Sequence, residues 1–146
     1  MIYSVIGQPG SGKTTISKHM IEEYLPNAFH IDGDDIRKLF NNKDYSKSGR
    51  IKNITLANQI AKYLHLNGND VIMSLVSPYR ETREEFKEQI GDNIVEVYLH
   101  TSEVRGRENF FVDDYEQPIN NFIDISTDDM SIDECVKKII YNVRNK

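Results

Sequence analysis

The first residues of the chain carry the pattern that most restricts its fold. Residues 7–14 read Gly-Gln-Pro-Gly-Ser-Gly-Lys-Thr and match the G-x-x-x-x-G-K-[ST] signature of a phosphate-binding loop. An apolar run at residues 2–6 predicts a buried strand directly before the loop, and residues 15–21 predict a helix directly after it. The signature requires this strand–loop–helix context. The sequence therefore predicts a nucleotide-phosphate site at the start of the first helix.

Each part of this loop has a physical role in holding phosphate. Glycines let successive backbone N–H groups point at phosphate oxygens, and the helix that follows adds its positive end. Lys13 can reach the outer phosphates, and the Thr14 hydroxyl is a ligand for Mg²⁺. The residues expected to hold the nucleotide are Gly7, Pro9, Gly10, Ser11, Gly12, Lys13, Thr14 and Thr15.

Length and composition indicate one globular domain. The chain has 146 residues, 38% of them hydrophobic, which suffices for a single core. Its net charge of −5 argues against a non-specific nucleic-acid binder. No apolar run reaches the length needed to span a membrane. The single cysteine, Cys135, cannot form an internal disulfide, and Met1 leads straight into the first predicted strand, so we expect a cytoplasmic protein without a signal peptide.

Apolar runs that predict strands alternate with helical patterns along the whole chain. After the first strand, further strands are predicted at residues 28–31, 71–76, 94–99 and 122–125. Their nearly continuous apolar character is typical of strands covered on both faces. This alternation predicts an α/β fold, with one P-loop domain over residues 1–146 and a five-stranded parallel sheet with helices on both faces.

The helices between these strands have recognisable ends. Apolar residues recur at helical spacing over residues 51–64, and Gly68 is a suitable stop. A shorter helix around residues 86–90 is expected to end at Gly91. The Ser-Ile-Asp-Glu segment at residues 131–134 resembles a capping box and predicts the start of a last helix.

A second motif follows the second predicted strand, where residues 32–37 read Asp-Gly-Asp-Asp-Ile-Arg. In a parallel α/β fold this strand end faces the phosphate loop. Carboxylates there can hold Mg²⁺ or take a proton from an attacking hydroxyl, and Arg37 can pair with an anionic substrate. A turn whose Asp caps the next helix would have a similar sequence, but the loop upstream favours the functional interpretation.

Metal binding is expected to rest on oxygen ligands from these two motifs. The third predicted strand has no Asp at its end, so the usual second acidic motif of P-loop proteins is missing there. The candidate Mg²⁺ ligands are Thr14, Asp32 and Asp34, together with water.

The order of these motifs resembles that of the adenylylsulfate kinases, P-loop enzymes that phosphorylate the 3′-hydroxyl of adenosine 5′-phosphosulfate. The family carries D-G-D-N-x-R after its second strand, matched here by residues 32–37. Its aromatic–Ser segment and Arg-x-x-Asn pair correspond to residues 45–46 and 50–53, and its S-P-Y-R stretch corresponds to residues 77–80. The similarity extends from the N-terminus to about residue 99.

The resemblance implies a kinase that moves the γ-phosphoryl group of ATP to a hydroxyl of a nucleotide-like acceptor, with Mg²⁺. It makes Asp34 the catalytic carboxylate and Asp32 its partner on the Mg²⁺ side, while Lys13 holds the donor. The residues that would hold the acceptor are Arg37, Tyr45, Arg50, Asn53, Ser77, Pro78, Tyr79, Arg80 and Phe110. Family members are often dimers, so the resemblance also suggests a homodimer.

The C-terminal third departs from the family pattern. The family has a long lid with G-L-Y-x-K-A-R followed by F-T-G-I-D-x-P-Y-E, and the first of these is deleted here. The shortened lid is expected at about residues 103–118, where Phe110 or Phe111 and residues 115–118 resemble the remainder. Arg107 is expected to act on the transferring phosphoryl group, with Arg105 nearby; a solvated loop is the alternative.

Two other functions are left open by the sequence. Loss of most of a lid opens the acceptor pocket, which would then admit a hydroxymethylated base in DNA, such as 5-hydroxymethyluridine, or another small hydroxyl compound. A non-catalytic nucleotide-binding switch is an alternative of another class. The intact Lys13, Thr14 and carboxylate pair argue against the switch, because every part needed for transfer is present.

Overall fold

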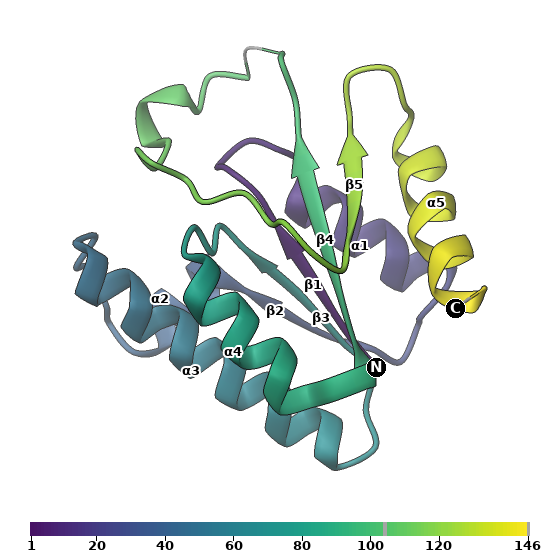
Figure 1. The fold of residues 1–146 in the computed structure, drawn as a ribbon, viewed down its shortest axis with the longest axis horizontal. Helices are drawn as coiled ribbons and strands as arrows, with labels where there is room; N and C mark the ends of the chain where they lie inside the picture. The colour runs from purple at the N-terminus through teal and green to yellow at the C-terminus, as the bar shows by residue number, and fades with distance from the viewer. Residues whose placement is uncertain (104, 146) are drawn as a thin grey trace.

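Five parallel strands form one sheet in the order β2-β3-β1-β4-β5 in the computed structural model, which describes residues 1–103 and 105–145 (Figure 1). The strands are β1 (Ile2–Ile6), β2 (Phe29–Asp32), β3 (Val71–Leu75), β4 (Ile94–His100) and β5 (Phe122–Ser126). Every neighbouring pair is parallel. The predicted five-stranded parallel sheet is therefore confirmed, with strand ends within one residue of those expected.

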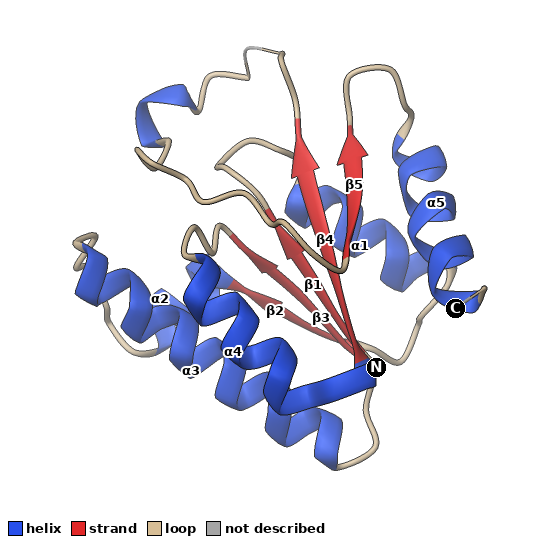
Figure 2. Cartoon of the chain, viewed as in Figure 1, coloured by secondary structure: helices blue, strands red, loops and turns tan. Residues whose placement is uncertain are grey.

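Helices cover both faces of this sheet (Figure 2). One face carries α1 (Lys13–Glu23) and α5 (Ile132–Arg144). The other carries α2 (Gly33–Leu39), α3 (Lys47–Leu66) and α4 (Arg80–Ile90). Two short 3-10 turns, η1 (Gly91–Asn93) and η2 (Glu108–Phe110), complete the elements. Among residues 1–103 and 105–145, every helix is too short or too polar to span a membrane.

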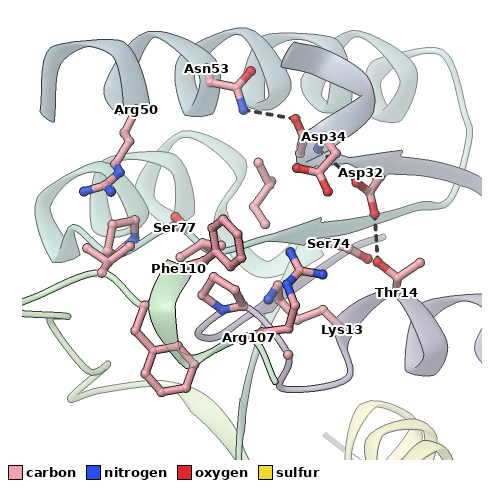
Figure 3. A pocket seen from close by; sticks show the side chains of 18 of the residues that line it. Lys13, Thr14, Asp32, Asp34, Arg50, Asn53, Ser74, Ser77, Arg107 and Phe110 are labelled. Atoms are coloured by element: carbon pink, nitrogen blue, oxygen red, sulfur yellow. Dashed lines mark hydrogen bonds between the residues drawn. The ribbon is translucent and has the colours of Figure 1, made fainter. Parts of the chain in front are cut away.

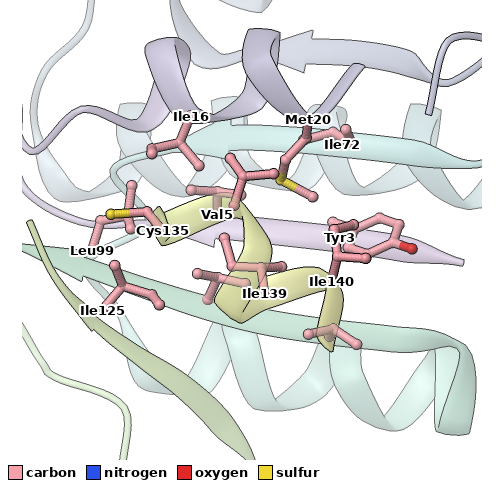
Figure 4. Packing of buried hydrophobic residues seen from close by; sticks show 13 residues of the cluster. Tyr3, Val5, Ile16, Met20, Ile72, Leu99, Ile125, Cys135, Ile139 and Ile140 are labelled. Atoms are coloured by element: carbon pink, nitrogen blue, oxygen red, sulfur yellow. The ribbon is translucent and has the colours of Figure 1, made fainter. Parts of the chain in front are cut away.

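Two hydrophobic clusters, one on each face, hold the layers together. Tyr3 and Val5 point toward α1 and α5, where they pack with Met20 and Ile139 (Figure 4). Ile2, which directly precedes Tyr3 on β1, belongs to the cluster on the opposite face. This alternation follows from the period of two along a strand. The nearly continuous apolar runs in the sequence are the consequence of burial on both sides.

Local sequence signals explain several of the helix ends. The Ser131 hydroxyl accepts a hydrogen bond from the Glu134 N–H at 3.1 Å, as the capping sequence predicts. Gly91 caps α4 with a φ of 73°, and Gly68 follows the end of α3 with a φ of 85°. The start of α3 lies four residues before the predicted one, because Ser46 caps it and polar residues form its first turn.

The carboxyl ends of the strands all lie at one edge of the sheet, and the connections there are irregular. The longest of them, residues 101–121 between β4 and β5, is called the β4–β5 segment below; its residue 104, part of the predicted lid, lies outside the described residues. Figure 1 shows this segment running from the tip of β4 across the carboxyl edge before it returns as β5. Ligands of such sheets bind at this edge.

Candidate active site

The phosphate loop connects β1 to α1 with a backbone that only glycine tolerates at two points. A Cβ atom on Gly7 would lie 2.4 Å from the carbonyl oxygen of Leu99, and φ is 152° there. Gly10 has a φ of 85°, and a Cβ there would lie 3.0 Å from the Cβ of Arg107. The glycines thus let the loop pass close to β4 and to the β4–β5 segment.

Lys13 begins α1 and points back into the loop. Its ammonium group donates to the Gln8 carbonyl at 2.9 Å and lies 3.5 Å from the Ser11 hydroxyl. Burial lowers the pKa of Lys13 to about 8; Asp32 and Asp34 oppose this change, and Arg107 adds to it. Since α1 has neither a side-chain cap nor an acidic residue in its first turn, its N-terminal N–H groups are free for an anion.

Asp32 joins the second motif to the phosphate loop. Its Oδ2 accepts a hydrogen bond from the Thr14 hydroxyl at 2.8 Å, and its Oδ1 accepts one from the Asp34 N–H at 2.9 Å (Figure 3). The second of these bonds makes Asp32 the N-cap of α2. Asp32 therefore caps α2 with one carboxylate oxygen and contacts the phosphate loop with the other.

Asp34 lies in the first turn of α2, two residues after the end of β2, whereas the sequence motif placed it at the strand end. Its carboxylate is exposed and, within the described part of the chain, accepts no hydrogen bond. Figure 3 shows Asp34 beside Asp32, across the cavity from Lys13 and Arg107. A carboxylate so placed can accept the proton of a hydroxyl group.

A cavity of about 840 Å³ separates the two motifs and brings together most of the residues expected from the sequence. Of the residues expected to hold the nucleotide or to act in catalysis, those that line the cavity are Pro9, Gly10, Gly12, Lys13, Thr14, Thr15, Asp32, Asp34 and Arg107. Of the residues expected to hold the acceptor, those that line it are Arg37, Tyr45, Arg50, Asn53, Ser77, Pro78 and Phe110. Its volume suits a nucleotide-sized ligand.

Four of the expected residues do not line this cavity. Gly7 and Ser11 lie within the loop, where Ser11 is buried. Tyr79 precedes α4, and the Lys47 ammonium nitrogen lies over the Tyr79 ring, 5.2 Å from the ring centroid. Arg80 turns toward the β4–β5 segment and donates from Nη2 to the Gln117 carbonyl at 2.8 Å. The motif identified these residue types, but not the direction in which the last two side chains point.

On the acceptor side, Arg37 and Asn53 already make hydrogen bonds within the protein. The Arg37 guanidinium lies 4.0 Å from the Tyr45 ring centroid and donates to the Asp44 carbonyl at 3.0 Å. Asn53 donates from Nδ2 to the Gly33 carbonyl at 3.2 Å, while its buried Oδ1 has no hydrogen-bond partner in the described residues. A buried oxygen without a partner is costly, so it is a candidate contact for a bound acceptor.

The β4–β5 segment closes one side of the cavity. The Arg107 guanidinium carbon lies 5.5 Å from the ring centroid of Phe110, and both side chains line the cavity. Phe110 and Tyr45 are largely exposed, at 66% and 62%. Exposed aromatic rings at a cavity are surfaces on which a flat base can stack.

Sequence reasoning missed a buried arginine that organises this region. Arg83, on α4, is 4% exposed and donates to the carbonyl of Ser77 at 2.6 Å and to the carbonyl of Glu116. Its Nε lies 3.6 Å from Oε2 of the buried Glu96 on β4. Ser77 has a φ of 43°, in the left-handed region, so Arg83 stabilises a strained backbone at the cavity. The sequence signal that points to such a partner is Glu96, a charged residue within an otherwise apolar strand.

The chain is similar to known proteins in both sequence and fold. A family model described as adenylylsulphate kinase matches residues 1–125. An adenylyl-sulfate kinase of Rippkaea orientalis is 35% identical, over 91% of this chain and 85% of that enzyme, and one of Oceanobacillus iheyensis is 29% identical, over 96% and 82%. The Mycobacterium tuberculosis APS kinase CysC, in complex with AMPPNP and APS, has the same fold, with a TM-score of 0.83, 23% identity and coverage of 99% of this chain and 97% of that one.

Proposed function

This chain belongs to the adenylylsulfate kinase family, and we propose that it transfers the γ-phosphoryl group of ATP to the 3′-hydroxyl of adenosine 5′-phosphosulfate. It is an ATP-dependent kinase that acts on a hydroxyl group of a nucleotide-like acceptor. The specific acceptor is supported by the activity named for its relatives. The observation that carries the chemistry is the Asp34 carboxylate, which lies across the cavity from Lys13 and accepts no hydrogen bond from the residues that the structure describes.

On the donor side, the triphosphate of ATP would lie along the phosphate loop. The N-terminal N–H groups of α1 and the Lys13 ammonium would contact its outer phosphates. Arg107, from the β4–β5 segment, would place a second positive charge against the transferred group. We propose that this segment is a shortened lid, which excludes water from the reaction by covering the loop.

The residues present also fit a magnesium ion. The Thr14 hydroxyl and the Asp32 carboxylate lie 2.8 Å apart beside Lys13, and hard oxygen donors of this kind are the ligands Mg²⁺ prefers. Asp32 pairs in register with Ser74 of β3, so β2 supplies the carboxylate that β3 lacks. When bound, Mg²⁺ neutralises charge on the outer phosphates.

The acceptor would enter from the side of α2 and α3. Tyr45 and Phe110 would stack on its base, and Arg37 and Arg50 would pair with its anionic groups. Asn53 would offer its buried Oδ1, which has no partner among the residues at hand, to a donor group on the acceptor. The acceptor hydroxyl would then give its proton to Asp34 as it attacks the γ-phosphorus in line with the leaving ADP.

A variant pair on α2 tests this assignment. Asp34→Asn should lower kcat for adenosine 5′-phosphosulfate by about 100-fold or more, because the base is removed while the ATP site is intact. Asp35→Asn is the matched control, since its neighbouring side chain is also exposed and does not line the cavity. Transfer would be followed with ATP labelled at the γ-phosphate. Full activity in Asp34→Asn would exclude Asp34 as the base.

The hydroxymethylated DNA base and the nucleotide-binding switch are not favoured by the family comparisons. We also propose a homodimer and a cytoplasmic location. The dimer is supported only by the resemblance, and light scattering tests it directly. The location is supported by the single buried cysteine.

A further inference from the structure

The second residue of the phosphate loop makes an unusual contact with the β4–β5 segment. The Gln8 side chain donates from Nε2 to the Val112 carbonyl at 2.9 Å and accepts from the Val112 N–H at Oε1, also at 2.9 Å. One carboxamide thus uses a donor and an acceptor on the main chain of a single residue. The pair imitates the two bonds that opposite residues exchange between neighbouring strands. Val112 itself is 7% exposed, so this point of the segment is packed down.

The main chain of Gln8 belongs to the phosphate site. Its carbonyl accepts from the Lys13 ammonium at 2.9 Å and from the Ser11 N–H at 3.2 Å. The same residue therefore contacts the catalytic lysine through its backbone and the β4–β5 segment through its side chain. Nothing in the loop signature specifies this position, which is one of its variable residues.

The stretch held by this contact carries the cavity-lining side chains of the segment. At its beginning, Arg105 donates from Nη1 to the Gly10 carbonyl at 3.3 Å. At its end stands the Gln8–Val112 pair. Between the two anchors lie Arg107, in contact with Gly10, and Phe110, both of which line the cavity.

We propose that Gln8 is a positioning residue that fastens the β4–β5 segment to the phosphate loop and so holds Arg107 over the donor phosphates. The inference rests on the proposed function, because it assigns Arg107 to the transferred phosphoryl group. A positive charge stabilises a transition state best when it is already in place, and a long arginine side chain on an irregular segment needs such fixing. The shortened lid is thereby held in place, in part, by a side chain of the phosphate loop that it covers.

Kinetics of four single variants and one double variant test the proposal. Gln8→Met keeps the length of the side chain and removes both hydrogen bonds, so we expect kcat to fall about tenfold while KM for ATP changes less than twofold. Gln8→Asn keeps the amide but shortens its reach, and should behave in the same way. Gln59→Met, on the exposed side of α3, is the control. Arg107→Ala should lower kcat about 1000-fold, with no further loss when Gln8→Met is added. Unchanged kcat in Gln8→Met, or additive losses in the double variant, would overturn the proposal.

Amide exchange of Val112 gives a readout that does not depend on activity. In the unaltered protein its N–H should be protected, and Gln8→Met should speed its exchange at least tenfold, while Gln59→Met leaves it unchanged. Fast exchange in the unaltered protein would refute the contact itself. If the chain transferred phosphate to no acceptor but Val112 stayed protected, the proposed function would fail and the contact would stand.

Discussion

At the scale of single residues, Lys13 lies in surroundings that disfavour the charged form of its ammonium group. Burial, with a smaller contribution from Arg107, lowers its pKa to about 8 against the opposing effect of Asp32 and Asp34. A triphosphate in the loop would reverse this balance, because its negative charge favours the ammonium form. Binding of nucleotide and binding of a proton at Lys13 are therefore expected to be coupled.

This coupling predicts a pH dependence of nucleotide affinity. Above a pKa of about 8 the free protein loses the Lys13 charge, so the Kd for Mg-ATP should rise about tenfold between pH 7 and pH 9. Calorimetry in buffers of different ionisation enthalpy should show close to one proton taken up at pH 9 and almost none at pH 7. Lys18→Arg, at an exposed position of α1, should leave both results unchanged. A flat Kd across this range would contradict the expected environment of Lys13.

Motif residues could be predicted from sequence, but their partners could not. The loop signature identified Lys13 and Thr14, and the acidic motif identified Asp32, because such chemistry needs fixed spacings along the chain. Gln8 stands at a position that the signature leaves free, and its partner Val112 is 104 residues away. No local pattern encodes a contact of that kind.

At the scale of elements, a buried ion cluster links α4 to β4. Glu96 is 2% exposed and lies near both Arg83 and Lys87. Burial raises the pKa of Glu96, while Lys87 and Arg83 oppose the change. Lys87 also donates to the Asn120 carbonyl at 2.9 Å, so the cluster fixes the end of the β4–β5 segment as well.

Removing one member of this cluster should be costly. Arg83→Met leaves the Glu96 charge poorly compensated and frees the strained Ser77, so we expect the free energy of unfolding to fall by about 3–5 kcal/mol. Because the folded protein with a raised Glu96 pKa binds a proton more readily than the unfolded chain, the loss should be smaller at pH 5 than at pH 7. Urea denaturation at the two pH values measures both effects.

The double variant Arg83→Met/Glu96→Met is the control for this account. It removes both charges and should recover part of the lost stability, since no unpaired charge stays in the core. A double variant less stable than Arg83→Met alone would show that the ion pair is not the source of the loss.

At the scale of the whole molecule, the sequence predicted the sheet and its two covered faces but not the path of the β4–β5 segment. Each strand run is apolar because it is buried on both sides, and this signal is local. Among its described residues the segment contains one short turn, η2, and its course is fixed by distant residues such as Gln8, Arg83 and Lys87. Its relation to the cavity therefore had to come from the structure.

Because part of the core lies away from the cavity, substitutions there should change the stability of the fold without changing the affinity for Mg-ATP. Ile139 on α5 is fully buried against the sheet, so Ile139→Ala should lower the free energy of unfolding by about 2–5 kcal/mol. Tyr141→Ala, on the exposed face of the same helix, should change it by less than about 0.5 kcal/mol. Since α5 does not line the cavity, both folded variants should bind Mg-ATP as the unaltered protein does. Weakened binding in folded Ile139→Ala would contradict this separation.

A competition between acceptors tests the central claim most directly. The protein would be given γ-labelled Mg-ATP with equimolar adenosine 5′-phosphosulfate and 5-hydroxymethyluridine DNA, and the labelled products would be separated and identified by mass spectrometry. The account predicts label on the 3′-oxygen of adenosine 5′-phosphosulfate, and none when Asp34→Asn replaces the unaltered protein. Label that enters only the DNA would contradict it.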